Sequence, residues 1–150
     1  EGTKQTGFKM IPGNSIAKDP TVTVKANSEA CWLFVKIEKS TNFDNFMTYG
    51  IADGWTALND ANADGVADDG IYYRTVDATT IDTDFAVLAN NSVSVKNTVT
   101  KEILNALDKN TDGTDKEEKN YPTLSFTAYA VQRDTNISTA AQAWEIANNK

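Results

Sequence analysis

Two short acidic stretches hold the side chains of this chain that are best suited to chemistry. The first acidic loop, within residues 59–70, reads D-x-N-x-D-G-x-x-D-D from Asp60 to Asp69. The second acidic loop, within residues 108–120, reads D-x-N-x-D-G-x-D from Asp108 to Asp115. Calcium takes about six to eight oxygen ligands, and a tight loop supplies them from side chains at positions 1, 3 and 5, with glycine at 6 and a carbonyl at 7. Both stretches match this pattern, which indicates calcium binding.

The match assigns a ligand set to each loop. In the first acidic loop the candidate calcium ligands are Asp60, Asn62, Asp64, the carbonyl of Val66, Asp68 and Asp69. In the second acidic loop they are Asp108, Asn110, Asp112, the carbonyl of Thr114, and Asp115.

Neither loop has the bidentate glutamate that an EF-hand places at position 12, where Ile71 and Lys119 stand. This predicts dissociation constants at the weak, extracellular end, about 10⁻⁴ to 10⁻³ M. Asp, Asn and Gly also gather in loops simply because they form turns. Two near-copies of the pattern in one acidic chain favour calcium over this simpler interpretation.

Most other chemistries lack their residues. The 150-residue chain has no histidine and one cysteine, Cys31. This excludes Ser-His-Asp and Cys-His mechanisms, intramolecular disulfides and the usual zinc sites. Adjacent carboxylates such as Asp68 and Asp69 do not form a pair across a cleft, as glycoside hydrolysis requires. We therefore expect no enzyme, and we interpret Cys31 as a small hydrophobic residue inside a strand.

The charge of the chain limits its partners. The net charge is −7 at pH 7 and the isoelectric point is near 4.5. Such a chain repels nucleic-acid phosphates and anionic membranes. Its longest apolar run, residues 30–35, is too short to span a bilayer. We expect no nucleic-acid partner and no membrane insertion, and we interpret the chain, which opens at Glu1, as a mature or trimmed form.

Short segments of alternating polarity predict the strands that position the loops. The central prediction is a hairpin over residues 20–38, in which residues 21–25 and 31–38 are strands and residues 26–29 are the turn. Residues 31–38 are apolar on one face and half apolar on the other, which places them in the middle of a sheet. The other predicted strands are residues 8–11, 71–76 and 121–132, a pair at 49–52 and 55–58 around Asp53-Gly54, and strands at 85–88 and 92–96 around the turn 89–91.

Helices are expected to be few and short. Phe43, Phe46 and Met47 have helical spacing within residues 42–47, and Thr100 is suited to cap a helix over residues 100–107. A capping box, Thr139-Ala140-Ala141-Gln142, opens a last helix whose buried side is predicted to hold Ala140, Trp144 and Ala147. The sequence therefore predicts one domain over residues 1–150. Its fold class is an all-β, antiparallel, jelly-roll-like β-sandwich with short peripheral helices.

Several motifs resemble one family. Residues 9–24 are similar to the PG-x-x-x-x-KD-P-x-V-x-V entry of TasA/camelysin-like proteins, which are secreted by Gram-positive bacteria with SipW-type signal peptides. Further similar segments, in the same order, are Asp53-Gly54-Trp55 and residues 70–74, 99–102, 124–132 and 140–144. The resemblance covers most of the chain.

The resemblance implies a TasA/camelysin-like jelly-roll β-sandwich domain over residues 1–150. It implies a secreted, extracellular or cell-surface protein that assembles with itself into biofilm-matrix filaments through edge-strand pairing. In the family's fibre-forming members an N-terminal donor strand completes the sheet of the next subunit. Here that strand has been trimmed, or residues 6–11 serve as the donor, or this member does not polymerise in this way.

The acidic loops are insertions relative to the family pattern. The proteinase activity attached to the camelysin name has no support in a chain without histidine. The alternative function is a monomeric calcium-dependent surface or carbohydrate-binding module that uses exposed aromatic residues such as Trp55 and Tyr73.

Overall fold

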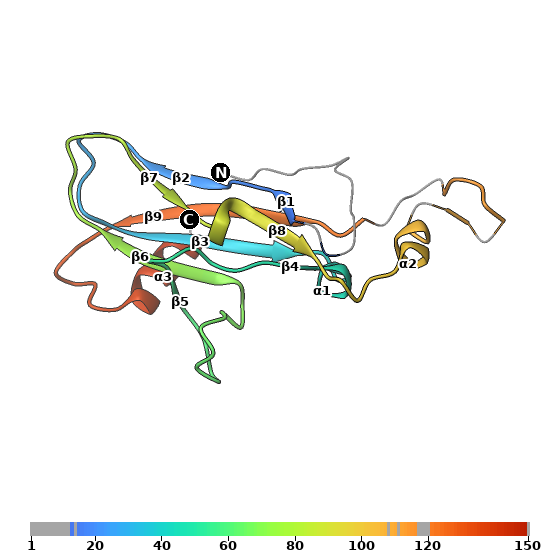
Figure 1. The fold of residues 1–150 in the computed structure, drawn as a ribbon. Coiled ribbons are helices and arrows are strands. Elements are labelled where there is room, and N and C mark those ends of the chain that lie inside the picture. The colour runs from blue at the N-terminus through green and yellow to red at the C-terminus, as the bar shows by residue number, and fades with distance from the viewer. Residues whose placement is uncertain (1–12, 14, 108, 111, 117–120, 150) are drawn as a thin grey trace.

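The computed structural model describes residues 13, 15–107, 109–110, 112–116 and 121–149, which fold mainly into antiparallel strands with a few short helices (Figure 1). One layer is a four-stranded sheet in the order β5-β6-β3-β9. Its strands are β5 (Thr56–Ala57), β6 (Ile71–Val76), β3 (Cys31–Lys39) and β9 (Leu124–Gln132). The predicted strand over residues 8–11 lies outside the described residues, as does the candidate donor segment 6–11.

The second layer is built from two short sheets that continue one another. They have the strand orders β1-β8-β4 and β2-β7. Between them, Lys18 donates its backbone N–H to the carbonyl of Asn91 (2.8 Å), and Val87 donates to that of Pro20 (3.1 Å). The strands are β1 (Ser15–Ala17), β2 (Thr21–Val24), β4 (Met47–Thr48), β7 (Thr83–Ala86) and β8 (Ser92–Val95).

Apolar side chains from both layers meet in one core, which makes the architecture a β-sandwich. The alternation of β3 produces this directly, because Leu33, Val35 and Ile37 point into the core while Phe34 points to the opposite face. The second layer contributes Val22, Val24, Val93, Val95 and Met47. The predicted all-β sandwich is confirmed, and the jelly-roll connectivity stays a prediction.

Helix α3 (Ala140–Asn148) covers the outer face of the four-stranded sheet. The predicted capping box is present, since Thr139 and Gln142 each accept the other's backbone N–H. One of the three residues predicted for the buried side of this helix is wrong. Ala143 and Ala147 are buried against Phe34, whereas Ala140 is only partly buried. The predicted inward position of Trp144 agrees with its ring, which lies 5.3 Å from that of Phe34.

The remaining helical segments are short. They are α1 (Phe43–Phe46), η1 (Ala89–Asn91) and α2 (Lys101–Asn105). The predicted cap of α2 is confirmed, since the Thr100 hydroxyl oxygen accepts the backbone N–H of Ile103 at 3.2 Å. Helix α2 stands away from the sandwich at one end (Figure 1). The first acidic loop projects from the lower side of the sandwich in the same view. None of the helices in the described part of the chain is long and apolar enough to cross a membrane.

Three predicted strand pairs are wrong. β2 pairs with β7, in the register Val22↔Phe85, and β3 pairs with β6 and β9, so residues 20–38 cross between layers and form no hairpin. β7 and β8 do not pair with each other, and β5 pairs with β6 rather than with residues 49–52. In each case a turn lies between the two segments, but each segment pairs with a strand that is more distant in the sequence.

Candidate functional site

β9 is an outer strand of the four-stranded sheet in the described part of the chain. β9 has nine residues, and in the described part of the chain its one strand partner is β3. It contains no charged residue and no proline, and its register with β3 runs without a bulge from Leu124 to Gln132. Natural proteins use charged residues, prolines and bulges to block an edge strand, and β9 has none of these three. The outermost strands on the other side of the two layers, β4 and β5, have two residues each.

The backbone groups that face outward from β9 can be assigned from the ladder. Arg133 donates its N–H to the carbonyl of Ala30 (2.9 Å), and Ser40 donates to that of Thr123 (2.9 Å). Both bonds extend the β3–β9 register by one pair, so the odd-numbered residues of β9 bond to β3. The backbone N–H and carbonyl groups of the even-numbered residues therefore point away from the sheet. They belong to Leu124, Phe126, Ala128, Ala130 and Gln132.

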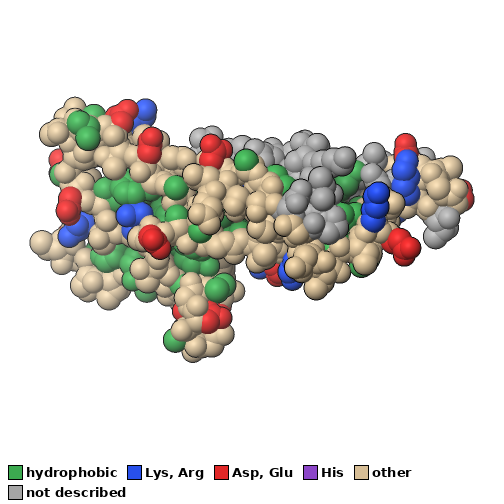
Figure 2. All heavy atoms as spheres, viewed as in Figure 1, with side chains coloured by type: hydrophobic (Ala, Val, Ile, Leu, Met, Phe, Trp, Pro, Cys, Tyr) green, Lys and Arg blue, Asp and Glu red, His purple; other side chains and the backbone are tan. Residues whose placement is uncertain are grey.

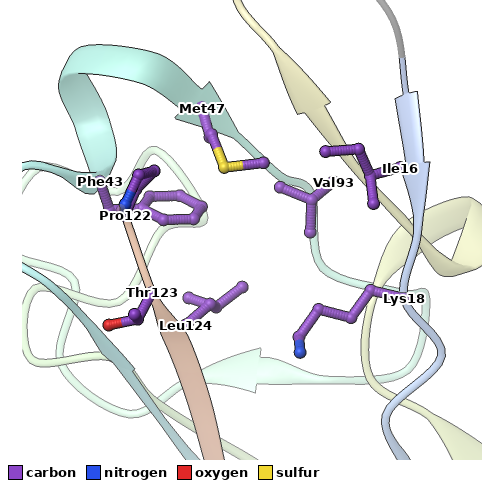
Figure 3. Close-up of a pocket in the computed structure, with 8 residues that line it drawn as sticks. All are labelled: Ile16, Lys18, Phe43, Met47, Val93, Pro122, Thr123 and Leu124. Carbon is purple, nitrogen blue, oxygen red and sulfur yellow. The ribbon is translucent and has the colours of Figure 1, made fainter. Parts of the chain in front are cut away.

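The same side of the sandwich contains a narrow apolar pocket between the layers (Figure 3). Its free volume is about 10 Å³, close to the space of one water molecule. In Figure 3 the side chains of Ile16, Met47 and Val93 point toward those of Phe43 and Leu124. The full lining is Ile16, Lys18, Phe43, Met47, Val93, Pro122, Thr123 and Leu124, so β1 and the beginning of β9 form opposite walls.

Lys18 is the charged member of this lining. Its residue is 6% exposed, and its Nζ lies 5.5 Å from the centre of the Phe126 ring. Burial lowers the pKa of the Lys18 ammonium, and the electron-rich ring face offsets part of the lost hydration. Toward the end of β9 the residues on the inward face become more exposed, since Ala128 is half-buried and Ala130 is exposed. The sandwich is therefore closed at the start of β9 and open toward its end.

The first acidic loop folds around its own carboxylates. One oxygen of Asp60 accepts the backbone N–H of Asp64 (3.1 Å), and the other accepts that of Gly65 (2.8 Å). Asp64 accepts the backbone N–H of Val66 (2.8 Å) and the amide of Asn62 (3.1 Å). Glycine at position 6 is required here, because Gly65 has a φ of 83°. The predicted ligands Asp60, Asn62 and Asp64 are thus brought together at the tip, where Figure 2 shows acidic side chains.

The other candidate ligands of this loop are placed differently. Asp68 accepts the backbone N–H of Ala61 at 2.9 Å, which keeps it beside the loop. Asp69 turns toward the base, where it accepts the Asn59 amide (2.5 Å) and the Ile71 backbone N–H (3.1 Å). Val66, whose backbone carbonyl is the candidate ligand, is 58% exposed. Asp69 is therefore committed to closing the loop onto β6, and it is the member of the predicted set least able to serve as a ligand.

The side chains of the second acidic loop are arranged less favourably for calcium binding than those of the first. Asp108 lies outside the described residues. Asp112 accepts the hydroxyl (2.6 Å) and the backbone N–H (3.0 Å) of Thr114, and the hydroxyl contact is the main reason that the pKa of Asp112 is lowered. Asn110 donates its side-chain amide to Thr114. Asp115 pairs with the ammonium of Lys109, which competes for the carboxylate that calcium needs.

Over the described residues, no three Asp, Glu or Cys side chains are grouped closely enough to hold a metal ion. Calcium also takes amide and backbone carbonyl oxygens. Two of the six candidate ligands in the first acidic loop, Asn62 and the carbonyl of Val66, are of these kinds.

The aromatic residues proposed for carbohydrate binding have structural partners. Trp55 donates its indole N–H to the carbonyl of Ala86 (2.9 Å), and its ring packs 5.3 Å from the guanidinium of Arg74. Tyr73 is half-buried, and its ring lies 6.2 Å from that of Trp32. Cys31 is buried, as predicted for a small hydrophobic residue, and burial raises the pKa of its thiol.

Sequence reasoning located the acidic loops but missed the β9 edge and the pocket beside it. The charge-free run over residues 124–132 was a usable signal. Nothing in the sequence indicated that this run lies at the edge of a sheet. Comparison of the chain with protein-family models, with curated proteins and with solved structures finds no match.

Proposed function

We propose that this chain is a secreted structural subunit that assembles with itself into extracellular or cell-surface filaments of the biofilm-matrix type. Assembly takes place when a strand of one copy pairs with the open edge of β9 in another. The resemblance to TasA/camelysin-like proteins motivates this proposal. The observation that carries it is the nine-residue, uncharged edge of β9, whose even-numbered backbone groups have no strand partner in the described part of the chain.

A strand added beside β9 makes backbone hydrogen bonds to it and also covers exposed apolar side chains. Its backbone supplies hydrogen bonds to the outward groups of β9, from Leu124 to Gln132. Its inward side chains cover Ala130, which is exposed on the face that otherwise points into the core. The apolar pocket beside Leu124 and Ile16 marks where the two layers already meet, so an added strand lies along an existing apolar seam. Adding one strand to a sheet edge in this way repeats from copy to copy and produces a filament.

The test is electron microscopy of the purified chain and of two variants at one position, Ala130→Pro and Ala130→Val. Proline removes the outward N–H of residue 130 and leaves the β3 ladder intact, because that ladder uses the N–H groups of residues 129 and 131. Valine keeps the N–H and adds bulk. We expect filaments from the wild type and from Ala130→Val, and monomers from Ala130→Pro.

Thermal melting shows that both variants are folded before assembly is compared. The proposal fails if the wild-type chain stays a monodisperse monomer at high concentration with and without calcium. Filaments from Ala130→Pro that match those of the wild type place the contact elsewhere than on β9, and they also contradict the proposal.

We further propose that the first acidic loop binds calcium, which orders it and stabilises the subunit. Asp60, Asn62 and Asp64 converge at the tip of the loop, and the carboxylates repel one another without a cation. With a dissociation constant of about 10⁻³ M, 10 mM calcium stabilises the folded chain by about 1.4 kcal/mol. For a chain of this length, that raises the melting temperature by about 3–6 °C.

The calcium proposal is tested by melting curves with 10 mM calcium and with chelator, in the wild type, Asp60→Asn and Asp112→Asn. We expect the calcium-dependent rise to disappear in Asp60→Asn and to remain in Asp112→Asn. An unchanged melting temperature in the wild type contradicts calcium binding by either loop. Loss of the rise in Asp112→Asn alone assigns it to the second acidic loop instead.

A further inference from the structure

The chain contains four aspartates that are followed directly by a glycine. They are Asp53, Asp64, Asp69 and Asp112. Such a pair can react with itself, because glycine has no side chain that keeps its backbone nitrogen away from the side-chain carboxyl carbon of the aspartate. A bond between these two atoms closes a five-membered succinimide ring. How firmly the fold holds the carboxylate and the glycine N–H therefore decides which of the four pairs can react.

The pair Asp64-Gly65 is held at both groups. The N–H of Gly65 donates to the carboxylate of Asp60 (2.8 Å), and the carboxylate of Asp64 accepts the backbone N–H of Val66 (2.8 Å). An N–H donor favours the ionised carboxylate, whereas ring closure requires the neutral carboxyl group, from which an oxygen can leave as water. Both bonds must therefore open before this pair reacts.

The other two Asp-Gly pairs in the acidic loops are held in the same way. Each glycine N–H donates to a backbone carbonyl, at 3.4 Å from Gly70 to Ala67 and at 3.0 Å from Gly113 to Asn110. Each carboxylate accepts the backbone N–H two positions further on, at 3.1 Å for Asp69 and 3.0 Å for Asp112. The fold therefore protects all three Asp-Gly pairs of the acidic loops.

Asp53-Gly54 differs from these three pairs. Both residues are exposed, and in the part of the chain that the structure describes neither the Asp53 carboxylate nor the Gly54 N–H has a hydrogen-bond partner. Gly54 has a φ of 98°, so the turn itself favours the residue that reacts most readily after an aspartate. Both reacting groups are therefore available in the folded chain without the breaking of a hydrogen bond.

We propose that Asp53-Gly54 is a site of spontaneous covalent modification, at which Asp53 becomes isoaspartate in the folded chain. The nitrogen of Gly54 bonds to the side-chain carboxyl carbon of Asp53, and one carboxyl oxygen leaves as water with the carboxyl proton and the N–H proton. Water then adds to the main-chain carbonyl carbon of Asp53 and breaks its bond to Gly54, so that the chain continues through the former side chain. One water leaves and one enters, so the product is an isomer and no co-reactant is consumed.

The modification lengthens a crossing between the two layers of the sandwich. Before the turn, Ala52 donates its N–H to the carbonyl of Val87 (2.9 Å), which directly follows β7. After the turn, Thr56 pairs with Tyr73 of the four-stranded sheet. The new linkage adds one carbon atom to the backbone between these two anchor points. Since the conversion needs no enzyme, its extent records how long the folded chain has been in water.

The test is peptide mapping of the purified chain after prolonged incubation in neutral buffer with chelator. Isoaspartate is located by electron-transfer fragmentation, and its total amount is measured with an isoaspartate-specific methyltransferase. We expect the folded chain to convert Asp53 at least about tenfold faster than any of the other three aspartates, because two hydrogen bonds hold each of those pairs. A parallel incubation in urea removes the fold, and there we expect the four aspartates to convert at similar rates.

Two variants separate the chemistry from the fold. Asp53→Glu should abolish the signal at this position, because a glutamate would have to close a less favourable six-membered ring. Asp60→Ala removes the acceptor of the Gly65 N–H, and we expect it to raise the rate at Asp64 about fivefold while the rate at Asp53 stays as in the wild type. Thermal melting shows that both variants are folded.

The proposal is overturned if Asp53 stays unmodified in the folded wild type, or if any of the other three aspartates converts as fast as Asp53. An unchanged rate at Asp64 in Asp60→Ala contradicts the protection by hydrogen bonds on which the selectivity rests. These readouts follow single peptides in the presence of chelator, so they do not depend on filament assembly or on calcium binding.

Discussion

Two glycines in the first acidic loop have the same backbone conformation but very different surroundings. Gly65 has a φ of 83° and Gly70 a φ of 76°, so an alanine at either position adopts the left-handed region. A Cβ on Gly65 meets no atom within 4 Å, whereas a Cβ on Gly70 lies 2.3 Å from the backbone oxygen of Ile37. The pair Gly65→Ala and Gly70→Ala therefore separates backbone strain from steric conflict with the central strand.

The expected costs follow from these contacts. Gly65→Ala carries only the left-handed strain, about 1 kcal/mol. Gly70→Ala carries the same strain and also pushes away the Ile37 carbonyl by about 1 Å, since ordinary C···O contacts are about 3.3–3.6 Å. That movement disrupts the bond from the Ile37 N–H to the Gly70 carbonyl, now 2.8 Å, which is worth about 1 kcal/mol, and it distorts the ladder of β3. We expect Gly70→Ala to cost about 3 kcal/mol in total.

The assay is urea unfolding at 25 °C followed by tryptophan fluorescence, with chelator present so that calcium does not contribute. The free energy of unfolding should fall by about 1 kcal/mol in Gly65→Ala and by about 3 kcal/mol in Gly70→Ala. In thermal melts of the same variants, this corresponds to a fall in melting temperature of about 2–4 °C and about 6–12 °C. Losses of free energy of unfolding that agree within about 0.5 kcal/mol would refute the reasoning. They would show that Gly70 does not approach β3 as closely as the structure places it.

Three further predictions concern side chains outside this loop. Burial is the main reason that the pKa of Tyr49 is raised above its ordinary value, so its folded form holds the proton that the unfolded form releases above about pH 10. The stability of the wild type should therefore fall more steeply between about pH 10 and 12 than that of Tyr49→Phe, as measured by urea unfolding. A Cβ on Gly54 lies 2.7 Å from the guanidinium of Arg74. Gly54→Ala should therefore lower the free energy of unfolding by about 1 kcal/mol less in an Arg74→Met background than in the wild type. Losses of free energy that simply add in the double variant would contradict this contact. Thr139→Ala removes the capping box of α3 and should cost about 1 kcal/mol, and an unchanged melting curve would show that the cap adds no stability.

The sequence was a good guide where structure is local. The alternation of residues 31–38 correctly predicted a strand in the middle of a sheet, with one face buried and the other partly buried, because successive side chains of a strand point to opposite sides. Thr100 and the Thr139–Gln142 pair correctly predicted two helix starts, since a cap is satisfied within three residues. The tip of the first acidic loop also formed as its spacing indicated, around Asp60 and Asp64.

The sequence was a poor guide where partners are distant. The polar turn after β2 was correctly placed, yet β2 pairs with β7 some 60 residues further on, as in Thr23↔Asp84. The buried side of α3 shifted from Ala140 to Ala143 because the position of Phe34 on the sheet decides which residues meet it. Asp69 accepts the side-chain amide of Asn59, ten positions away, which lies within reach only once the loop is closed onto β6.

The tip of the first acidic loop therefore owes its turn to the sequence alone, since Asp60 and Asp64 accept backbone N–H groups two to five positions away. The open edge of β9 was decided by the tertiary structure. The physical reason is that alternation specifies which face of a strand is buried, whereas every strand offers the same backbone hydrogen-bonding groups to any neighbour. Which strand remains at the edge depends on how all the apolar faces are buried together, and no single segment contains that information.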